Sequence, residues 1–303
     1  MRSTDATEAS VPDVPGASAR GEAHGTDRAR TEILFAGDDT SAVDAFHART
    51  KWESSLEKPL STRIRAFLAE PLLREIVSRS RNVYHGVERI VLPETDLGTM
   101  SLQEALLSRR SMSSEAGSKG HAIGVADLSA ILKHGYGVIG ERRSNDGPVQ
   151  RLRTSPSAGA LYPLEIYPVV MGVEGLPAGV YHYDAVEHTL SCLRREDARV
   201  LMPGFEFQAG LNAQASAVLV VTAVLLRSMA KYLDRGYRFV MNEAGALTQN
   251  FHLAAVARGV PGCVWGGFCD QDVAAYVGAD GTREIVVLGF ILGKRMPGES
   301  SVA

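Results

Sequence analysis

Two adjacent side chains that can move protons, Lys231 and Tyr232, follow the most apolar segment of the chain, residues 217–226. A lysine that is desolvated beside a bound cofactor has a lowered pKa and can act as a base, and a neighbouring tyrosine can relay or donate a proton. A solvated charged turn is the alternative, because Asp234 and Arg235 come next in the sequence. The residue types leave both interpretations open.

Cations at two distant places in the sequence have the chemistry of an anion site. Arg109, Arg110 and Ser111 end a segment that begins at Ser101, and Lys294 lies close to the end of the chain. A guanidinium fork and a hydroxyl can hold a phosphate, and Lys294 could supply a second cation to it. Alternatively, the arginines complement the dipole at a helix C-terminus, and Lys294 belongs to a solvated tail. Position in the sequence does not decide between these possibilities.

Small residues are concentrated in residues 153–163, which read RTSPSAGALYP and are called the signature loop below. Small side chains let the backbone approach a flat ligand closely, although they are also typical of a simple turn. Gly266 and Gly267 are typical of a bend. The loop positions that could line a ligand are Ser155, Pro156, Ser157, Ala158, Gly159 and Leu161.

A polar stripe and a glycine pattern also have competing interpretations. Glu243, Ala246 and Asn250 share one face of a helix that the apolar spacing predicts for residues 237–258. Such a stripe is more often solvated or helix-bridging than catalytic.

Residues 135–140 match G-x-G-x-x-G, but we expect a helix before them and a polar loop after them. A dinucleotide site needs a strand followed by a helix, so we interpret this pattern as a turn.

The composition excludes several classes of protein. Hydrophobic residues make up 45% of the 303 residues and charged residues 22%, as in an ordinary globular protein. The formal net charge of −3 gives no overall field that would attract nucleic acid or anionic lipid. Cys192, Cys263 and Cys269 form no C-x-x-C pair, which argues against disulfides and zinc and favours a reduced, cytoplasmic protein. Because we find no signal peptide and no apolar run of about eighteen residues, we expect no membrane contact.

Four segments are expected along the chain. Residues 1–42 lack large apolar side chains and should form a disordered tail. Residues 43–97 should form a helical arm, because apolar residues recur there at helical spacing as far as about Leu92. Residues 98–295 should hold the main domain, and residues 296–303 a C-terminal tail.

The main domain is predicted to be of the α+β class, because its strands are not regularly separated by crossover helices. A capping box at Ser101 and Glu104 opens its first helix, and a polar loop is expected before Ser155. Further helices are predicted at 127–134, 237–258 and 271–277. Strands are predicted at 165–173, 180–183, 189–193, 217–226 and 284–292.

Taken in order, these motifs resemble the SagB-type dehydrogenases, a branch of the nitroreductase superfamily. The similarity covers residues 98–295, and its most specific part is P-S-A-G-A-L-Y-P, whereas R-R-S and G-G-F are general to nitroreductases. The chain departs from the pattern at Ala246, where many relatives have histidine, and at Ser113, where nitroreductases often have a basic residue. The matching motifs are R-R-S at 109–111, the signature loop, K-Y at 231–232, E-A-G and Q-N between 243 and 250, G-G-F at 266–268, and G-K at 293–294.

The resemblance implies a mixed, largely antiparallel sheet flanked by helices, in a homodimer with FMN at its interface. The arginines, Ser111 and Lys294 would hold the phosphate and ribityl chain, and the signature loop would lie along the isoalloxazine ring. The two glycines at 266 and 267 would approach its far face. The residues thus assigned to FMN are Arg109, Arg110, Ser111, Ser155, Pro156, Ser157, Ala158, Gly159, Leu161, Asn250, Gly266, Gly267 and Lys294.

Lys231 and Tyr232 match the proposed catalytic pair of family members that oxidise thiazoline or oxazoline rings to azoles. Aromatising such a ring removes a proton and a hydride, so a base beside the flavin is the minimum requirement. The expected substrate is a ribosomally synthesised precursor peptide, and the expected partner is a cyclodehydratase. An NAD(P)H-dependent reductase of nitroaromatics or quinones, and a non-catalytic scaffold of a biosynthetic complex, remain as alternatives.

Overall fold

The longest apolar runs of the chain form the centre of a seven-stranded sheet in which every neighbouring pair is antiparallel. The computed structural model describes residues 41–78, 81–112, 120–143, 148–200 and 215–295. The α+β class and the five predicted strands are confirmed, with small shifts at their ends. In sheet order the strands are β1 (Arg89–Val91), β8 (Thr189–Arg194), β7 (Gly179–Asp184), β5 (Leu164–Val170), β9 (Ala217–Val224), β11 (Glu284–Leu292) and β10 (Gly262–Trp265).

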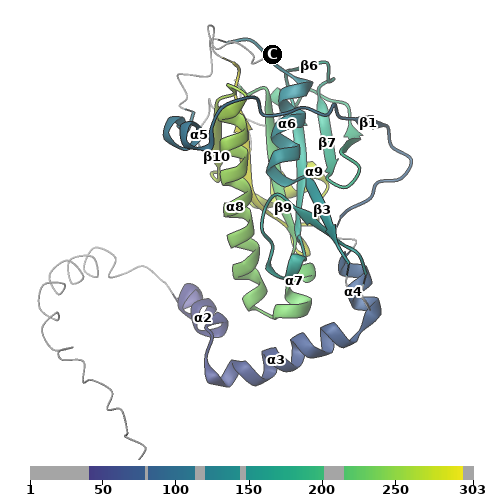
Figure 1. Cartoon of the computed structure of the whole chain (residues 1–303), viewed down its shortest axis with the longest axis vertical. Coiled ribbons are helices and arrows are strands. Elements are labelled where there is room, and N and C mark those ends of the chain that lie inside the picture. Colours follow the sequence, from purple (N-terminus) through teal and green to yellow (C-terminus); the bar gives the residue numbers. More distant parts are fainter. Residues whose placement is uncertain (1–40, 79–80, 113–119, 144–147, 201–214, 296–303) are drawn as a thin grey trace, which may run out of the picture. The chain divides into compact units, whose positions relative to one another are not determined.

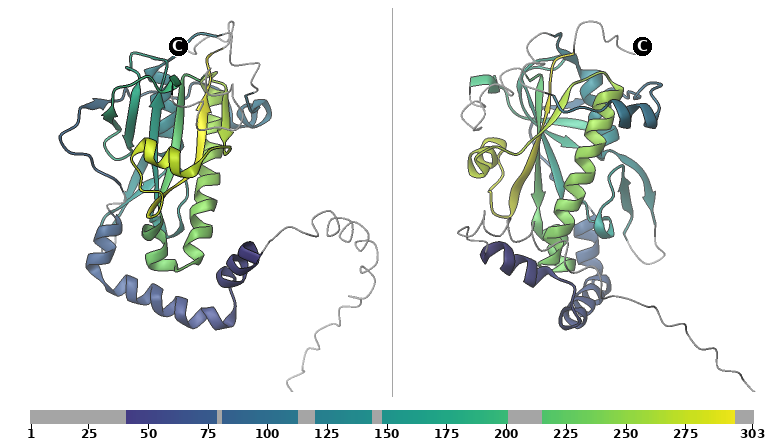
Figure 2. Two further views of the ribbon diagram at one scale, coloured as in Figure 1. Left: turned by 180° about the vertical axis from the view of Figure 1, so that it is seen from behind. Right: turned by 90° about the vertical axis from the view of Figure 1, so that its left-hand side faces the viewer.

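Both faces of this sheet are covered by helices. Alternate residues of β9 belong to two separate apolar cores, with Leu219 in one and Val220 in the other, because side chains alternate along a strand. Helices α6 (Val125–Tyr136) and α8 (Arg235–Ala257) lie on the first face, as Figure 1 shows. Helix α9 (Asp270–Val277) lies on the second face, which is turned toward the viewer in the left panel of Figure 2. The helices predicted at 237–258 and 271–277 are therefore confirmed.

The chain divides into two compact units, residues 1–48 and residues 49–303. Of the first unit only residues 41–48 are described, and they form most of α2 (Ser41–Thr50). Apart from Ser41 and Ala42 in α2, the two predicted tails lie outside the described residues.

Helices α3 (Ser54–Ala69) and α4 (Pro71–Ser78) begin the second unit. The helical pattern expected as far as about Leu92 is wrong at its end, because β1 pairs with β8 at the edge of the sheet. Strand β1 has only three residues, and its central Ile90 pairs with Leu190. So short a strand depends on its partner and has no periodicity of its own.

Two short helices carry predicted site residues. Helix α5 (Leu102–Ser108) begins with the predicted capping box, in which Ser101 Oγ accepts from the Glu104 backbone N–H and the Glu104 carboxylate accepts from the Ser101 backbone N–H. Helix α7 (Leu225–Tyr232) begins where β9 ends. The lysine and tyrosine at 231 and 232 therefore close a helix and do not lie in a charged turn.

The polar segment after α6 is a hairpin and not the loop predicted before Ser155. Strand β3 (Val138–Arg142) pairs with β4 (Gln150–Arg153). Most of β3 is exposed, so it lacks the apolar alternation that marks a strand in a sequence. The G-x-G-x-x-G glycines lead from α6 into β3, the reverse of the order that a dinucleotide site needs. A short parallel pair joins β2 (Ile123–Gly124) to β6 (Val173–Glu174).

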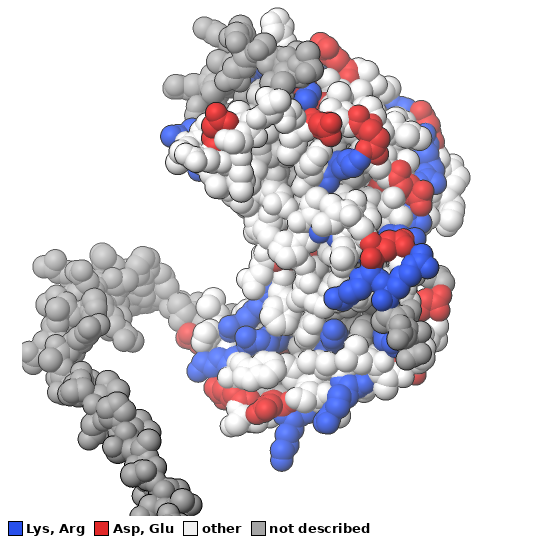
Figure 3. All heavy atoms as spheres, in the orientation of Figure 1, with Lys and Arg blue, Asp and Glu red and all other residues white. Residues whose placement is uncertain are grey.

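Across the described ranges, no helix is both long enough and apolar enough to cross a membrane. Basic and acidic side chains are interspersed on the face of the molecule that Figure 3 shows. The same residues include no group of three or more His, Cys, Asp or Glu side chains that could hold a metal ion. The three cysteines are free thiols.

Candidate active site

The signature loop, residues 153–163, forms a tight turn against α7. Gly159 and Tyr162 have positive φ angles of 67° and 44°. A Cβ atom on Gly159 would lie 2.6 Å from the hydroxyl oxygen of Tyr232 and 2.7 Å from Nζ of Lys231. Position 159 therefore requires glycine for its backbone conformation and for space. The structure brings the two most distinctive motifs of the sequence together in one site.

Lys231 is half-buried on the last turn of α7. Burial lowers the pKa of its ammonium group, and the positive charge of Arg142 lowers it further. Its Nζ lies 5.1 Å from the centre of the Tyr232 ring and 5.8 Å from the centre of the Phe67 ring. Burial raises the pKa of the Tyr232 hydroxyl, which therefore keeps its proton at neutral pH. A base and a proton donor can thus act side by side.

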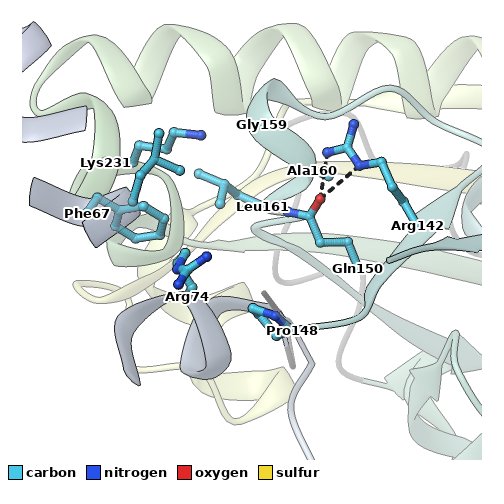
Figure 4. A pocket seen from close by; sticks show the side chains of 10 residues that line it. Phe67, Arg74, Arg142, Pro148, Gln150, Gly159, Ala160, Leu161 and Lys231 are labelled. Atoms are coloured by element: carbon cyan, nitrogen blue, oxygen red, sulfur yellow. Dashed lines mark hydrogen bonds between the residues drawn. The ribbon is translucent and has the colours of Figure 1, made fainter. Parts of the chain in front are cut away.

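A cavity of about 210 Å³ opens beside Lys231, between α3, α4, α7, the β3–β4 hairpin and the signature loop (Figure 4). Phe67 and Leu161 pack together as an apolar part of its lining. Arg74, Arg142 and Lys231 bring three cations to it. The cavity is therefore partly apolar and partly cationic.

Residues of the predicted helical arm reach this site, which the sequence did not indicate. Phe67 of α3 is only 4% exposed, and Arg63 Nε donates to the Ala230 carbonyl of α7 at 2.6 Å. Arg235 of α8 donates to the Thr50 carbonyl at 2.6 Å. The helical spacing around Phe67 indicated a buried face, but it could not say against what that face packs.

The polar stripe of α8 bridges this helix to the signature loop. The buried Glu243 carboxylate accepts a hydrogen bond from the Tyr136 hydroxyl at 2.5 Å and bonds to the Ser157 hydroxyl. Burial raises the pKa of Glu243 to about 7, although these hydrogen bonds oppose the rise. Asn250 Nδ2 donates to Ser155 Oγ at 3.0 Å. Glu243 and Asn250 therefore bridge α8 to neighbouring elements, and the assignment of Asn250 to FMN stays a prediction.

Arg153 anchors the start of the signature loop, and the sequence did not single it out. Its guanidinium carbon lies 4.4 Å from the centre of the Tyr136 ring and 5.1 Å from that of Tyr162. The Tyr162 hydroxyl accepts from the Arg153 backbone N–H at 3.0 Å, and Ser155 Oγ donates to the Gly135 carbonyl at 2.9 Å. Elsewhere in the loop, Leu161 is buried, Ala158 is partly buried and Pro156 is exposed.

The predicted phosphate-binding residues meet at the beginning of β10. Ser111 pairs with Gly262 in an isolated parallel bridge. The backbone N–H of Gly293, which precedes Lys294, donates to the Pro261 carbonyl at 2.8 Å. The R-R-S and G-K motifs, far apart in the sequence, therefore lie on adjacent stretches of backbone.

The cations of these two motifs differ in their partners. Arg110 Nη1 donates to the carbonyls of Leu107 at 2.9 Å and Arg109 at 2.8 Å, as the helix-dipole alternative expects. Among the residues that the structure describes, the Arg109 guanidinium and the Lys294 ammonium have no hydrogen bond and no ion pair. Two cations on neighbouring stretches of backbone, with no counter-charge in the described ranges, suit a phosphate such as that of FMN.

Helix α8 passes both the predicted phosphate-binding residues and the signature loop. Burial and, to a smaller extent, the charge of Arg109 lower the pKa of His252. Glu243, nine residues earlier and about 14 Å along the helix axis, bonds to the signature loop.

Gly266 and Gly267 follow β10, and Cβ atoms on them would meet open space. Within the described part of this chain nothing joins these glycines to the loop, so their role stays a prediction.

A second buried carboxylate, which the sequence did not indicate, fixes the start of α7 to the sheet. Glu165 of β5 lies 2.5 Å from Arg227 Nη1 of α7 and 2.7 Å from His182 Nε2 of β7. The Asn82 backbone N–H also donates to Glu165, at 2.7 Å. Burial alone would raise the pKa of Glu165, but Arg227 and His182 outweigh it and hold the pKa at about 2. Glu165 is thus a paired charge that helps to position the helix carrying Lys231.

The sequence model of the nitroreductase family matches residues 121–294, which include the signature loop, α7 and α8. The chain belongs to the nitroreductase family. It is accordingly a flavin-dependent oxidoreductase. The matched region begins after the R-R-S motif, so the assignment of residues 109–111 to FMN stays a prediction.

Two curated proteins are similar in sequence to this nitroreductase-family chain. A protein of Methanocaldococcus jannaschii that is named as a nitroreductase is 33% identical over 178 residues, which make up 59% of this chain and 84% of that protein. The microcin B17-processing protein McbC of Escherichia coli is 32% identical over 145 residues, 45% of this chain and 52% of that protein.

Two solved structures share the fold. A nitroreductase structure from Anabaena variabilis has a TM-score of 0.61 and 24% identity, covering 82% of this chain and 45% of that one. A chain in the E. coli microcin synthetase McbBCD complex with truncated pro-MccB17 bound has a TM-score of 0.51 and 21% identity, covering 87% of this chain and 96% of that one. The sequence match therefore covers about half the length of McbC, and the structural match covers about half the length of the Anabaena chain.

Proposed function

We propose that the protein is an FMN-dependent azoline dehydrogenase, which oxidises thiazoline or oxazoline rings in a ribosomally synthesised peptide to azoles. The observation that carries the proposal is the close approach of Gly159 to Lys231 and Tyr232, which leaves no room for a Cβ atom. A loop that lies along a flavin and a base that acts beside it would have to meet in this way. The identity to a microcin B17-processing protein supports a peptide substrate.

The chain's own residues fit the parts of FMN that they would hold. Arg109, Ser111 and Lys294 would bind the phosphate, because they converge beside β10 and neither cation has a counter-charge in the described ranges. Residues 155–161 would lie along the ring system, since the small residues of this loop let its backbone approach a flat ligand closely. Bound FMN supplies the hydride acceptor.

The protein side of the reaction is the removal of a proton. Azoline oxidation breaks one C–H bond to release a proton and another to release a hydride, which carries both electrons. Lys231 takes the proton in its neutral form, and the burial that lowers its pKa enlarges the neutral fraction. Tyr232 keeps its own proton and donates a hydrogen bond to the substrate ring. Phe67 and Leu161 exclude water from this side of the site.

The remaining parts of the proposal concern assembly. We infer a cytoplasmic homodimer with FMN at its interface, a precursor peptide as substrate and a cyclodehydratase as partner. The structural similarity to a chain of the McbBCD complex, which holds a truncated pro-peptide, supports a peptide substrate and a partner protein.

A second candidate function is the reduction of nitroaromatics or quinones by NAD(P)H. The relative from Methanocaldococcus jannaschii favours it, because it is named as a nitroreductase and the match covers 84% of its length. The two candidates share the flavin and differ in the direction of hydride transfer.

The test is to purify the protein with FMN and mix it with a thiazoline-containing peptide made by a cyclodehydratase. The proposal predicts a loss of about 2 mass units per ring and a yellow protein. Rapid bleaching by NAD(P)H without ring oxidation would establish the reductase instead. A colourless protein that cannot be reconstituted with FMN would point to the scaffold and overturn both.

A further inference from the structure

The lining of the cavity beside Lys231 is rich in basic side chains. Its three cations come from three separate elements, with Arg74 on α4, Arg142 on β3 and Lys231 on α7. Among the lining residues in the described part of the chain there is no aspartate and no glutamate. Figure 4 shows Arg142 and Lys231 on opposite sides of Leu161. A ligand in this cavity would therefore meet positive charge around an apolar surface.

In the β3–β4 hairpin, Arg142 differs from its neighbouring arginines in its described partners. Arg143 and Arg151 both pair with the carboxylate of Glu141, at 3.3 and 3.9 Å. Arg142 lies opposite Gln150 in the hairpin and, within the described ranges, bonds only the neutral side-chain amide of Gln150, through Nε at 3.1 Å and Nη2 at 2.5 Å. These bonds fix the guanidinium plane and leave its Nη1 group without a partner there. Arg142 thus lines the cavity, and no carboxylate in the described ranges pairs with it.

We propose that this cavity is a subsite for a carboxylate that the substrate carries next to the ring being oxidised. Arginine is suited to this role because its planar fork matches a carboxylate and stays charged at every pH at which the protein folds. The apolar contact of Phe67 with Leu161 suits the ring itself. This inference rests on the proposed azoline dehydrogenase function and specifies its substrate.

The chemistry of the ring places a carboxyl group at the required position. An azoline made from cysteine or serine keeps the carbonyl group of that residue on the ring. If the ring is the last residue of the peptide, this carbonyl belongs to a free carboxylate. If the ring is internal, the carbonyl belongs to an amide, and an acidic side chain on the following residue is the nearest anion. Both sources present the same group to Arg142.

A bound carboxylate should also change the titration of Lys231. The charge of Arg142 contributes to the lowered pKa of Lys231, after burial. An anion paired with Arg142 offsets that contribution, so the pKa of Lys231 should rise when the carboxylate is present. The pH at which oxidation becomes half-maximal should consequently be higher for a carboxylate substrate than for its amide.

The experiment measures equilibrium binding, independently of turnover, with azoles that can no longer be oxidised. A thiazole carboxylate and the corresponding carboxamide are titrated into the FMN-loaded protein by calorimetry. We expect the carboxylate to bind about tenfold or more tightly, and Arg142→Gln to remove that preference. Arg143→Gln is the matched control and should keep it, because Arg143 is exposed and pairs with Glu141. Equal binding of the two azoles, or an undiminished preference in Arg142→Gln, would overturn the subsite.

Peptides with a terminal ring acid, or with an internal ring followed by glutamate or glutamine, then distinguish the two sources of the carboxylate. A preference for the terminal acid over its amide identifies the chain end, and a preference for glutamate over glutamine identifies the side chain. No preference in either pair would contradict the subsite. If the azole carboxylate is preferred but no azoline is oxidised, the dehydrogenase function fails while the anion subsite stands.

Discussion

Two buried carboxylates, Glu165 on β5 and Glu243 on α8, show how differently this protein treats the same chemical group. Both are only 3% exposed. Glu165 has a pKa of about 2 and Glu243 a pKa of about 7. The difference lies in their partners, since burial raises the pKa of each. Arg227 and His182 outweigh burial at Glu165, whereas hydroxyl groups and a weaker effect of Arg153 do not outweigh it at Glu243.

This comparison separates a structural charge from one that can change near neutral pH. Glu165 stays ionised and ties α7 to the sheet through Arg227. Glu243 lies under the signature loop and bonds to Ser157 within it. Perturbed pKa values gather at functional sites because catalysis needs groups that titrate near the working pH. The incompletely compensated carboxylate is the one at the candidate active site.

The largest effect expected from this comparison is the loss of the Glu165 pair. Arg227→Met leaves a buried carboxylate without its cation and should lower the free energy of unfolding by about 3–5 kcal/mol, measured by urea unfolding at pH 7. Arg195→Met is the matched control, since Arg195 pairs with Glu88 near the surface, and it should cost less than about 1 kcal/mol. Equal losses in the two variants would show that Glu165 is not held by Arg227.

At Glu243 the pH dependence of stability has the opposite sign. Its folded-state pKa of about 7 lies above the ordinary value of 4.5, so its stabilising contribution is complete below pH 4.5 and is lost as the pH rises through 7. The full loss corresponds to about 3 kcal/mol. Glu243→Gln stays neutral, so its free energy of unfolding should fall less between pH 5 and pH 8 than that of the wild type.

Urea unfolding of the wild type and Glu243→Gln between pH 5 and pH 8 tests this prediction, and a surface variant serves as the control. Glu174→Gln changes an exposed carboxylate and should keep the slope of the wild type. Parallel pH profiles for the wild type and Glu243→Gln would mean that Glu243 is ionised throughout the range, as Glu165 is.

A smaller effect is expected when the hydroxyl partner of Glu243 is removed. Tyr136→Phe deletes the hydrogen bond at 2.5 Å and should cost about 1 kcal/mol at pH 8, where the carboxylate is charged. It should cost less at pH 5, because the lost bond favours the ionised form, and the pKa of Glu243 should rise further. Equal costs at both pH values would contradict a role for Tyr136 in setting that pKa.

Much of the fold could be predicted because its elements have strong local signals. The apolar run of β9, the helical spacing of α8 and the capping box of α5 each appear in the sequence and in the structure. Strands β1, β3 and β10 were missed, because they are short or exposed and depend on partners elsewhere in the chain. Local periodicity carries no information about such pairing.

The candidate site divides in the same way. The signature loop and Lys231 could be identified from motifs, and their contact through Gly159 agrees with a shared site. Phe67, Arg142 and the Glu165–Arg227 pair could not, because each acts through a residue that is distant in the sequence. Glu243 could be placed on a polar stripe, but its bonds to Tyr136 and Ser157 join it to residues that are distant in the sequence.

The central claim is that the signature loop and Lys231 form one redox site, and the most direct test is a single turnover without oxygen. FMN-loaded wild type and Lys231→Met are mixed with the thiazoline peptide, and flavin absorbance is followed after equal FMN occupancy has been verified. The account predicts that Lys231→Met reduces its flavin about 10²–10⁴-fold more slowly. A rate for Lys231→Met close to that of the wild type would contradict it.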